Sequence, residues 1–159
     1  MSANLVPGNH VCVRTILLTL LPAVTLMAGG PYGSWKMDTS RSTFSAEIPP
    51  KSLTVRIESH AKGQVFTLDR IEHDGRATSD SALLYLDGKE RDFGDGGCSG
   101  SQASRQIDSR TVEIVRKCAA GTWTRFVWRV TDGSTRVLEI TERQRDGRQA
   151  VRRVVLEKR

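Results

Sequence analysis

Apolar and polar side chains alternate along residues 122–131. Successive side chains of an extended strand point in opposite directions, so alternate positions form two faces. Phe126 and Trp128 fall on one face, and Arg125 and Arg129 fall on the other. The pattern predicts a half-buried β-strand that turns its aromatic side chains toward a core.

Three further runs with strand-like patterns flank this stretch. They cover residues 111–118, 137–141 and 150–156, and the last two are rich in β-branched residues. Each of those two follows an Asp-Gly pair, Asp132-Gly133 or Asp146-Gly147. Asp-Gly tolerates the positive φ that tight hairpin turns require. Residues 111–157 are therefore predicted to form four consecutive antiparallel strands in meander order.

Upstream, short strand-like runs at 53–58, 64–72 and 82–86 are separated by turn residues. The segment 42–50 lacks a period and is predicted to be irregular. Glycine, serine and aspartate dominate 94–104, which predicts a mobile loop. We expect an all-β domain of eight or nine antiparallel strands in an up-and-down meander. A closed small β-barrel covers the edges of such a sheet, and a β-sandwich is the alternative.

Residues 1–28 differ from the rest of the chain. Arg14 is their only charge, and the apolar run that follows it has the length of the hydrophobic region of a secretory signal peptide. It is short for a membrane span, which needs about 20 apolar residues. We expect a periplasmic or secreted protein with one mature domain at 29–159, whose membrane contact is confined to the signal before cleavage. An uncleaved anchor is the alternative.

The mature part contains two cysteines, Cys98 and Cys118. An even count in an exported chain favours a disulfide, and two ligands alone do not close a zinc site. If the chain turns at 108–110, antiparallel pairing brings Cys118 opposite residue 100 and near Cys98. A Cys98–Cys118 disulfide is predicted, worth roughly 3 kcal/mol in the chain-entropy model.

The formal net charge is +6. Removal of 1–28 lowers it to +5, because Arg14 is the only charge lost. Lys and Arg are spread along most of the chain, with a loose group at 152–159. Spread charge is typical of a solvated face, so nucleic acid and anionic lipid are not expected partners.

Several short motifs resemble a group of exported bacterial lipocalin-like proteins of unknown function. The motifs lie at 33–38 (GSWKMD), 41–44 (RSTF), 49–52 (PPKS), 85–89 (YLDGK) and 107–113 (IDSRTVE), and they cover most of the mature chain. Gly33 and Trp35 form a Gly-x-Trp similar to the lipocalin signature, in which the tryptophan closes one end of the barrel against an arginine from a late strand. The resemblance implies a lipocalin-like barrel and offers Arg152 or Arg153 as that arginine.

Few residues offer catalytic chemistry. The mature histidines, His60 and His73, each lie beside a predicted turn, where solvated side chains are expected. Asp69, Glu72 and Asp74 lie near His73 and suit either a metal cluster or ordinary turn chemistry, of which the second is preferred. The sequence contains neither a Gly-x-Ser-x-Gly motif nor a phosphate-binding loop. We expect no catalytic residue, no metal and no cofactor, and do not predict an enzyme.

The apolar interior remains as a candidate site. Six aromatic residues are candidates to line a cavity: Trp35, Phe44, Phe66, Tyr85, Phe126 and Trp128. A barrel of this size either fills with side chains or holds one small apolar ligand. The predicted function is non-covalent binding of a small hydrophobic molecule. The alternative is an envelope protein-interaction or inhibitor module with a solid core that uses the loop 94–104, and a hydrolase ranks third.

Overall fold

The computed structural model describes residues 30–44, 48–95 and 97–159. The predicted signal segment, 1–28, lies outside the described residues. Within them the chain forms ten strands and no helix. The strands are β1 Gly33–Thr43, β2 Ser52–His60, β3 Gly63–Ile71, β4 Ala77–Leu84, β5 Arg91–Asp95, β6 Cys98–Asp108, β7 Thr111–Cys118, β8 Trp123–Val130, β9 Thr135–Arg143 and β10 Gln149–Lys158.

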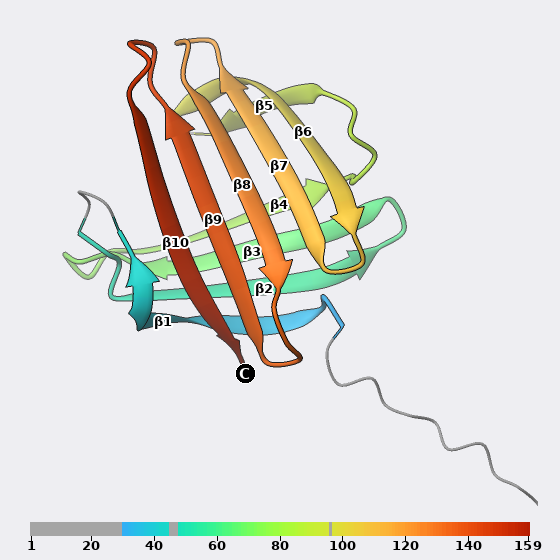
Figure 1. Ribbon diagram of the computed structural model, residues 1–159, viewed down its shortest axis with the longest axis vertical. Helices are drawn as coiled ribbons and strands as arrows, with labels where there is room; N and C mark the ends of the chain where they lie inside the picture. The colour runs from blue at the N-terminus through green and yellow to red at the C-terminus, as the bar shows by residue number, and fades with distance from the viewer. Residues whose placement is uncertain (1–29, 45–47, 96) are drawn as a thin grey trace, which may run out of the picture.

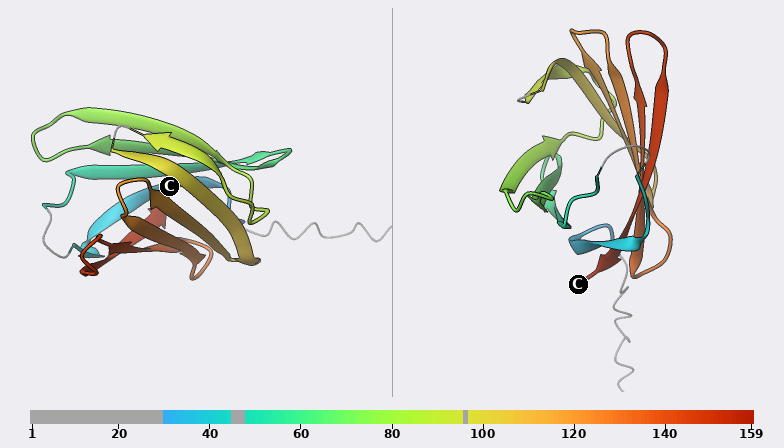
Figure 2. Two further views of the ribbon diagram at one scale, coloured as in Figure 1. Left: turned by 90° about the horizontal axis from the view of Figure 1, so that it is seen from above. Right: turned by 90° about the vertical axis from the view of Figure 1, so that its left-hand side faces the viewer.

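The strands form one antiparallel sheet in up-and-down order, as predicted (Figure 1). Each strand pairs with the next along the chain except at β4 and β5, which are the two edges, and β1 also pairs with β10. The sheet curls so that β2 to β4 cross β7 to β10 and face them (Figure 2). A single curled sheet is a lipocalin-like barrel left open between β4 and β5, and it excludes the β-sandwich.

Residues 94–104 lie mostly in strands, so the prediction of a mobile loop there is wrong. β5 and β6 form a hairpin, which raises the predicted eight or nine strands to ten. Gly100 pairs with Cys118, and a Cβ atom at Gly100 would lie 2.0 Å from the backbone oxygen of Lys117. Glycine here permits close approach of two strands instead of marking a loop. The predicted register and the Cys98–Cys118 disulfide are confirmed, with 5.3 Å between the two Cα atoms.

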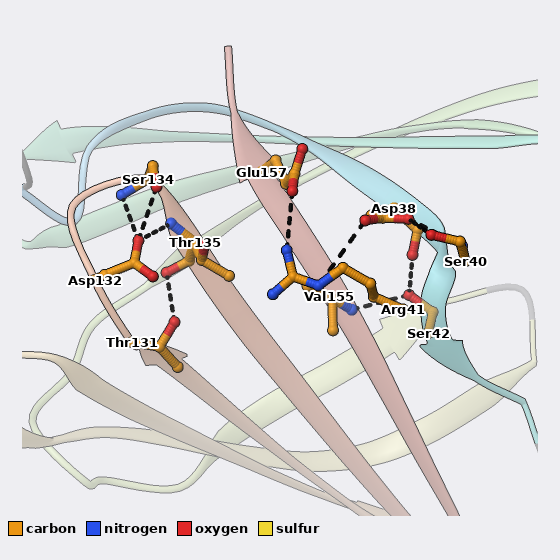
Figure 3. Close-up of polar contacts among 10 residues, drawn as sticks. All are labelled: Asp38, Ser40, Arg41, Ser42, Thr131, Asp132, Ser134, Thr135, Val155 and Glu157. Atoms are coloured by element: carbon orange, nitrogen blue, oxygen red, sulfur yellow. Dashed lines mark hydrogen bonds and ion pairs between the residues drawn. The ribbon is translucent and has the colours of Figure 1, made fainter.

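A bulge in β1 lets this strand pair with both halves of the sheet. Its register to β10 shifts after Asp38. The Ser42 hydroxyl donates to the backbone oxygen of Asp38 (2.6 Å) and accepts from the backbone N–H of Val155 (2.9 Å), as Figure 3 shows. The hydroxyl therefore replaces backbone partners that the bulge removes, and the strand bends there.

Trp35 fills the closed end of the barrel. Its side chain is fully buried beside Ile57 and Leu156. The guanidinium carbon of Arg136, on β9, lies 4.8 Å from the ring centroid, and the same guanidinium donates to the backbone oxygen of Pro31 at 2.8 Å. Burial lowers the pKa of Arg136 to about 10, so the side chain remains a cation at neutral pH.

The arginine that covers Trp35 is therefore Arg136, and the prediction of Arg152 or Arg153 is wrong. In the β9–β10 register Arg152 pairs with Ile140, four residues from the pair formed by Arg136 and Leu156. Arg152 lies at the other end of the interior, and Arg153 is exposed on the opposite face of β10.

Candidate functional site

The interior is hollow at the end away from Trp35. Two adjoining cavities of about 180 and 450 Å³ lie between β2 to β4 and β7 to β10. Both are lined by the same six residues: Leu68, Arg70, Phe126, Trp128, Ile140 and Arg152. The smaller extends to Phe44 and Leu53, and the larger extends to Phe66 and Ile114. Because the two cavities share these walls, they form one site, which we call the inner cavity.

Aromatic side chains form one wall of the inner cavity. Phe66 on β3 meets Trp128 on β8 edge to face, with ring centroids 5.4 Å apart and an interplanar angle of 62°. Trp128 is only 4% exposed, and its Nε1 has no acceptor among the described residues. A buried N–H without a partner is costly. This wall therefore combines a large apolar area with one unused donor.

Arginines give the inner cavity a polar side. Arg116 lies with its guanidinium carbon 4.1 Å from the ring centroid of Phe93 and 5.1 Å from that of Phe126. It donates to Gln102 Oε1 at 2.8 Å and lies 3.5 Å from an Asp95 carboxylate oxygen. Burial lowers the pKa of Arg116, and the charge of Asp95 opposes that shift. The side chain is thus a cation held between rings at the cavity wall.

Two more arginines complete this polar side. Arg152 forms an ion pair with Glu142, and Arg70 lies 3.3 Å from Glu72. Together with Arg116 they bring three guanidinium groups to the walls, where the described residues supply two carboxylates. The lining accordingly favours a ligand with an apolar body and a polar, electron-rich end.

Four of the six predicted lining residues meet at the inner cavity. Phe44, Phe66, Phe126 and Trp128 line it, whereas Trp35 is packed in the closed end. The sixth, Tyr85, lies after β4 with the Arg91 guanidinium carbon 4.0 Å from its ring centroid, and it lines neither hollow. That these side chains touch a ligand stays a prediction.

The sequence analysis placed none of the three arginines in the inner cavity and named Arg152 only as a candidate partner of Trp35, although strand parity could have found them. Arg116 is two residues after Ile114, Arg152 is two residues before Val154, and Arg70 is two residues after Leu68. Residues two apart in a strand share a face. The hydrophobic pattern identifies only the apolar member of each pair as facing inward, although the arginine two residues away lies on the same face.

Two of the polar residues considered as candidate metal or catalytic groups make turn contacts. The Nδ1 of His60 accepts the backbone N–H of Lys62, and Asp74 accepts that of Arg76, which is ordinary turn chemistry. Within residues 30–44, 48–95 and 97–159 no three His, Cys, Asp or Glu side chains are placed to hold a metal ion. In that part of the chain no helix is both long enough and apolar enough to span a membrane. The prediction that the protein is not an enzyme stays a prediction.

A curled antiparallel meander with a hollow at one end is the architecture of the lipocalin-like β-barrels. No protein-family model and no curated protein matches the chain. Among solved structures, its fold resembles a mutant of the fluorescent protein UnaG, with a TM-score of 0.56 and 14% identity over 80% of this chain and 95% of that chain. At this identity the likeness shows the fold alone.

Proposed function

We propose that the protein binds a small molecule with an apolar body and an anionic or otherwise electron-rich end, without a covalent bond, in the inner cavity. The observation that carries this proposal is Trp128, a buried side chain that borders both hollows while its indole N–H has no acceptor among the described residues. A ligand oxygen would supply that acceptor.

Apolar burial would provide most of the affinity. A ligand that loses about 200 Å² of apolar surface against the wall of Phe66, Phe126 and Trp128 gains about 5 kcal/mol. Arg116 and Arg152 already have protein partners, so a ligand anion would share those guanidinium groups with Gln102, Asp95 and Glu142. The polar end then fixes orientation more than it adds affinity.

We further propose that this binding takes place outside the cytoplasm. The Cys98–Cys118 disulfide is compatible with an oxidising compartment. The predicted signal segment and the resemblance to exported bacterial proteins support the same location. A periplasmic or secreted carrier of a poorly soluble compound is the role that fits these features together.

Two naphthalene probes of nearly equal shape test the proposal, neutral phenylnaphthylamine and anionic anilinonaphthalene sulfonate. Both are expected to fluoresce on binding, and the anion is expected to bind about tenfold more tightly. Ile140→Trp should fill the cavity and abolish binding of both probes. Arg152→Met should weaken only the anion. Arg153→Met, the same change at the exposed neighbour of Arg152 on the opposite face of β10, is the matched control.

Folding of each variant is checked by its thermal transition, and Leu68→Trp replaces Ile140→Trp if the latter does not fold. Full probe binding by a folded, filled variant would show that the inner cavity is not the site. Absence of binding by the wild type, together with a protein recovered bare in native mass spectrometry, would favour the solid interaction module instead.

A further inference from the structure

The basic residues are unevenly shared between the two halves of the chain. Residues 100–159 contain fourteen Lys and Arg against seven Asp and Glu, whereas residues 30–99 contain nine against eleven. The excess of positive charge therefore belongs to β6 to β10. Because strand alternation and register decide which side chains share a face, basic residues that are evenly spread along the sequence can lie together on one face of the sheet.

A groove on the outer face of β8 and β9 concentrates this charge. It lies between the β7–β8 turn and the β9–β10 turn, which Figure 1 shows at the same end of the strands, and has a volume of about 670 Å³. Of the residues that the structure describes, three arginines line it, Arg125, Arg143 and Arg145, and no carboxylate does. We call it the outer groove. Trp123 in its wall and Trp128 in the inner cavity lie on opposite faces of β8.

Two of the three arginines are available to a ligand. Arg125 donates to Glu113 at 2.6 Å, but Arg143 and Arg145 make no ion pair with any described residue. The stem of Arg145 crosses to the other turn, where a Cβ atom at Gly121 would lie 3.4 Å from it. The two hairpin turns thus build the groove jointly.

The other lining groups narrow the ligand chemistry. Trp123 is partly exposed, and none of the described cations stacks on its ring. Among the described residues that line the outer groove, it is the one aromatic side chain. Grooves for single-stranded nucleic acid use several aromatic platforms in series, so one ring fits a ligand of few units better. Gln144 and Gln149 add planar donors and acceptors suited to hydroxyl groups.

We propose that the outer groove binds an acidic saccharide, a sugar that carries carboxylate, sulfate or phosphate groups. The arginines pair with the planar or tetrahedral oxyanions through paired N–H donors. The apolar C–H face of a sugar ring packs on Trp123, and the two glutamines bind its hydroxyl groups. This site is independent of the inner cavity and of the function proposed for it.

A sulfated uronic-acid hexasaccharide is the probe, measured by calorimetry against maltohexaose, a thymidine hexanucleotide and inorganic sulfate. The acidic hexasaccharide is expected to bind, and maltohexaose is not. Arg143→Gln with Arg145→Gln should weaken binding about a hundredfold, and Trp123→Leu about tenfold. The double variant Arg129→Gln with Arg153→Gln removes the same charge elsewhere on the outer face and should change affinity less than about twofold.

Equal losses in the two double variants would show non-specific charge attraction and overturn the proposal. Tighter binding of the hexanucleotide with the same dependence on Trp123 would assign the outer groove to nucleic acid. Sulfate that competes fully at low concentration would reduce the site to an anion pocket. Trp123→Leu and both double variants change exposed or partly exposed positions, and their thermal transitions verify folding.

Discussion

The two ends of one barrel interior differ in packing, although a tryptophan lies at each. Around Trp35 the side chains of Ile57 and Leu156 are at most 1% exposed, and Arg136 covers the ring. Around Trp128 the walls stand apart and leave the inner cavity. In the sheet β1 joins β2 to β10, whereas β4 and β5 are the two edges. The same kind of residue is thus core at the closed end and a cavity wall at the other.

The largest effect is expected from Trp35→Ala. Removal of a fully buried tryptophan should cost about 3–5 kcal/mol of unfolding free energy, because the closed end cannot collapse around the void. Phe126→Ala, at a half-buried ring that already borders the hollow, should cost less than half as much. Urea titrations of both variants measure the two costs. Equal costs would contradict the contrast between the ends.

Much of this fold could be predicted from the sequence, because a strand pattern of period two carries its own face assignment. The predicted 111–157 meander, its outward arginines and the position of Cys118 opposite residue 100 all appear in the structure. The Asp-Gly signal was informative at Gly147, which has a φ of 86°. Gly133 has no positive φ; there the Asp132 side chain accepts the backbone N–H groups of Ser134 and Thr135 instead (Figure 3).

What could not be predicted depended on contacts between distant segments. Gly100 reads as a loop residue because only the position of Lys117 reveals why a side chain is excluded. Arg136 and Arg152 look alike in sequence, and only the register of β9 and β10 assigns one to Trp35 and the other to the inner cavity. The inner cavity itself depends on how the first strands face β7 to β10 across the interior, which no local pattern encodes.

The disulfide should rank second in effect. Replacing Cys98 and Cys118 together by serine opens a loop of 20 residues and should cost about 3 kcal/mol. The loss falls on the β5–β6 edge beside the opening, so probe affinity at the inner cavity should fall too. Thermal unfolding with and without reductant measures the first effect, and unchanged stability of the double variant would contradict it. Reductant should not alter that variant, which serves as the control.

The next prediction concerns Glu113, on the outer face of the sheet behind the inner cavity. Burial raises the pKa of Glu113, but hydrogen bonds from Arg125 and Arg105, at 2.6 and 2.5 Å, outweigh it and leave the pKa below its ordinary value. Glu113→Gln should cost about 1–2 kcal/mol, since both arginines remain partly solvated. Denaturant titrations at pH 7 measure this cost.

The stability difference between wild type and Glu113→Gln is expected to depend on pH, with a definite sign. Because the folded-state pKa is depressed, the stabilisation by Glu113 is fully present above the unfolded pKa of about 4.3 and is lost as pH falls through the folded value. The difference between wild type and Glu113→Gln should therefore be constant from pH 7 to 5 and shrink below about pH 4. A difference that grows on acidification would refute the assignment.

The smallest effect is expected in the bulge where β1 pairs with β10. Ser42→Ala leaves the backbone N–H of Val155 without its acceptor in the β1 bulge and should cost about 1 kcal/mol. Ser40→Ala is the control and should cost a few tenths of a kcal/mol, because among the described residues this exposed hydroxyl bonds to Asp38 alone. Amide exchange at Val155 reports the local change directly. The pairing of β1 with β10 closes the barrel beside Trp35. Faster exchange confined to Val155 and its neighbours in Ser42→Ala would identify the hydroxyl as the group that keeps this pairing closed. Unchanged exchange would show that packing alone holds the bulge.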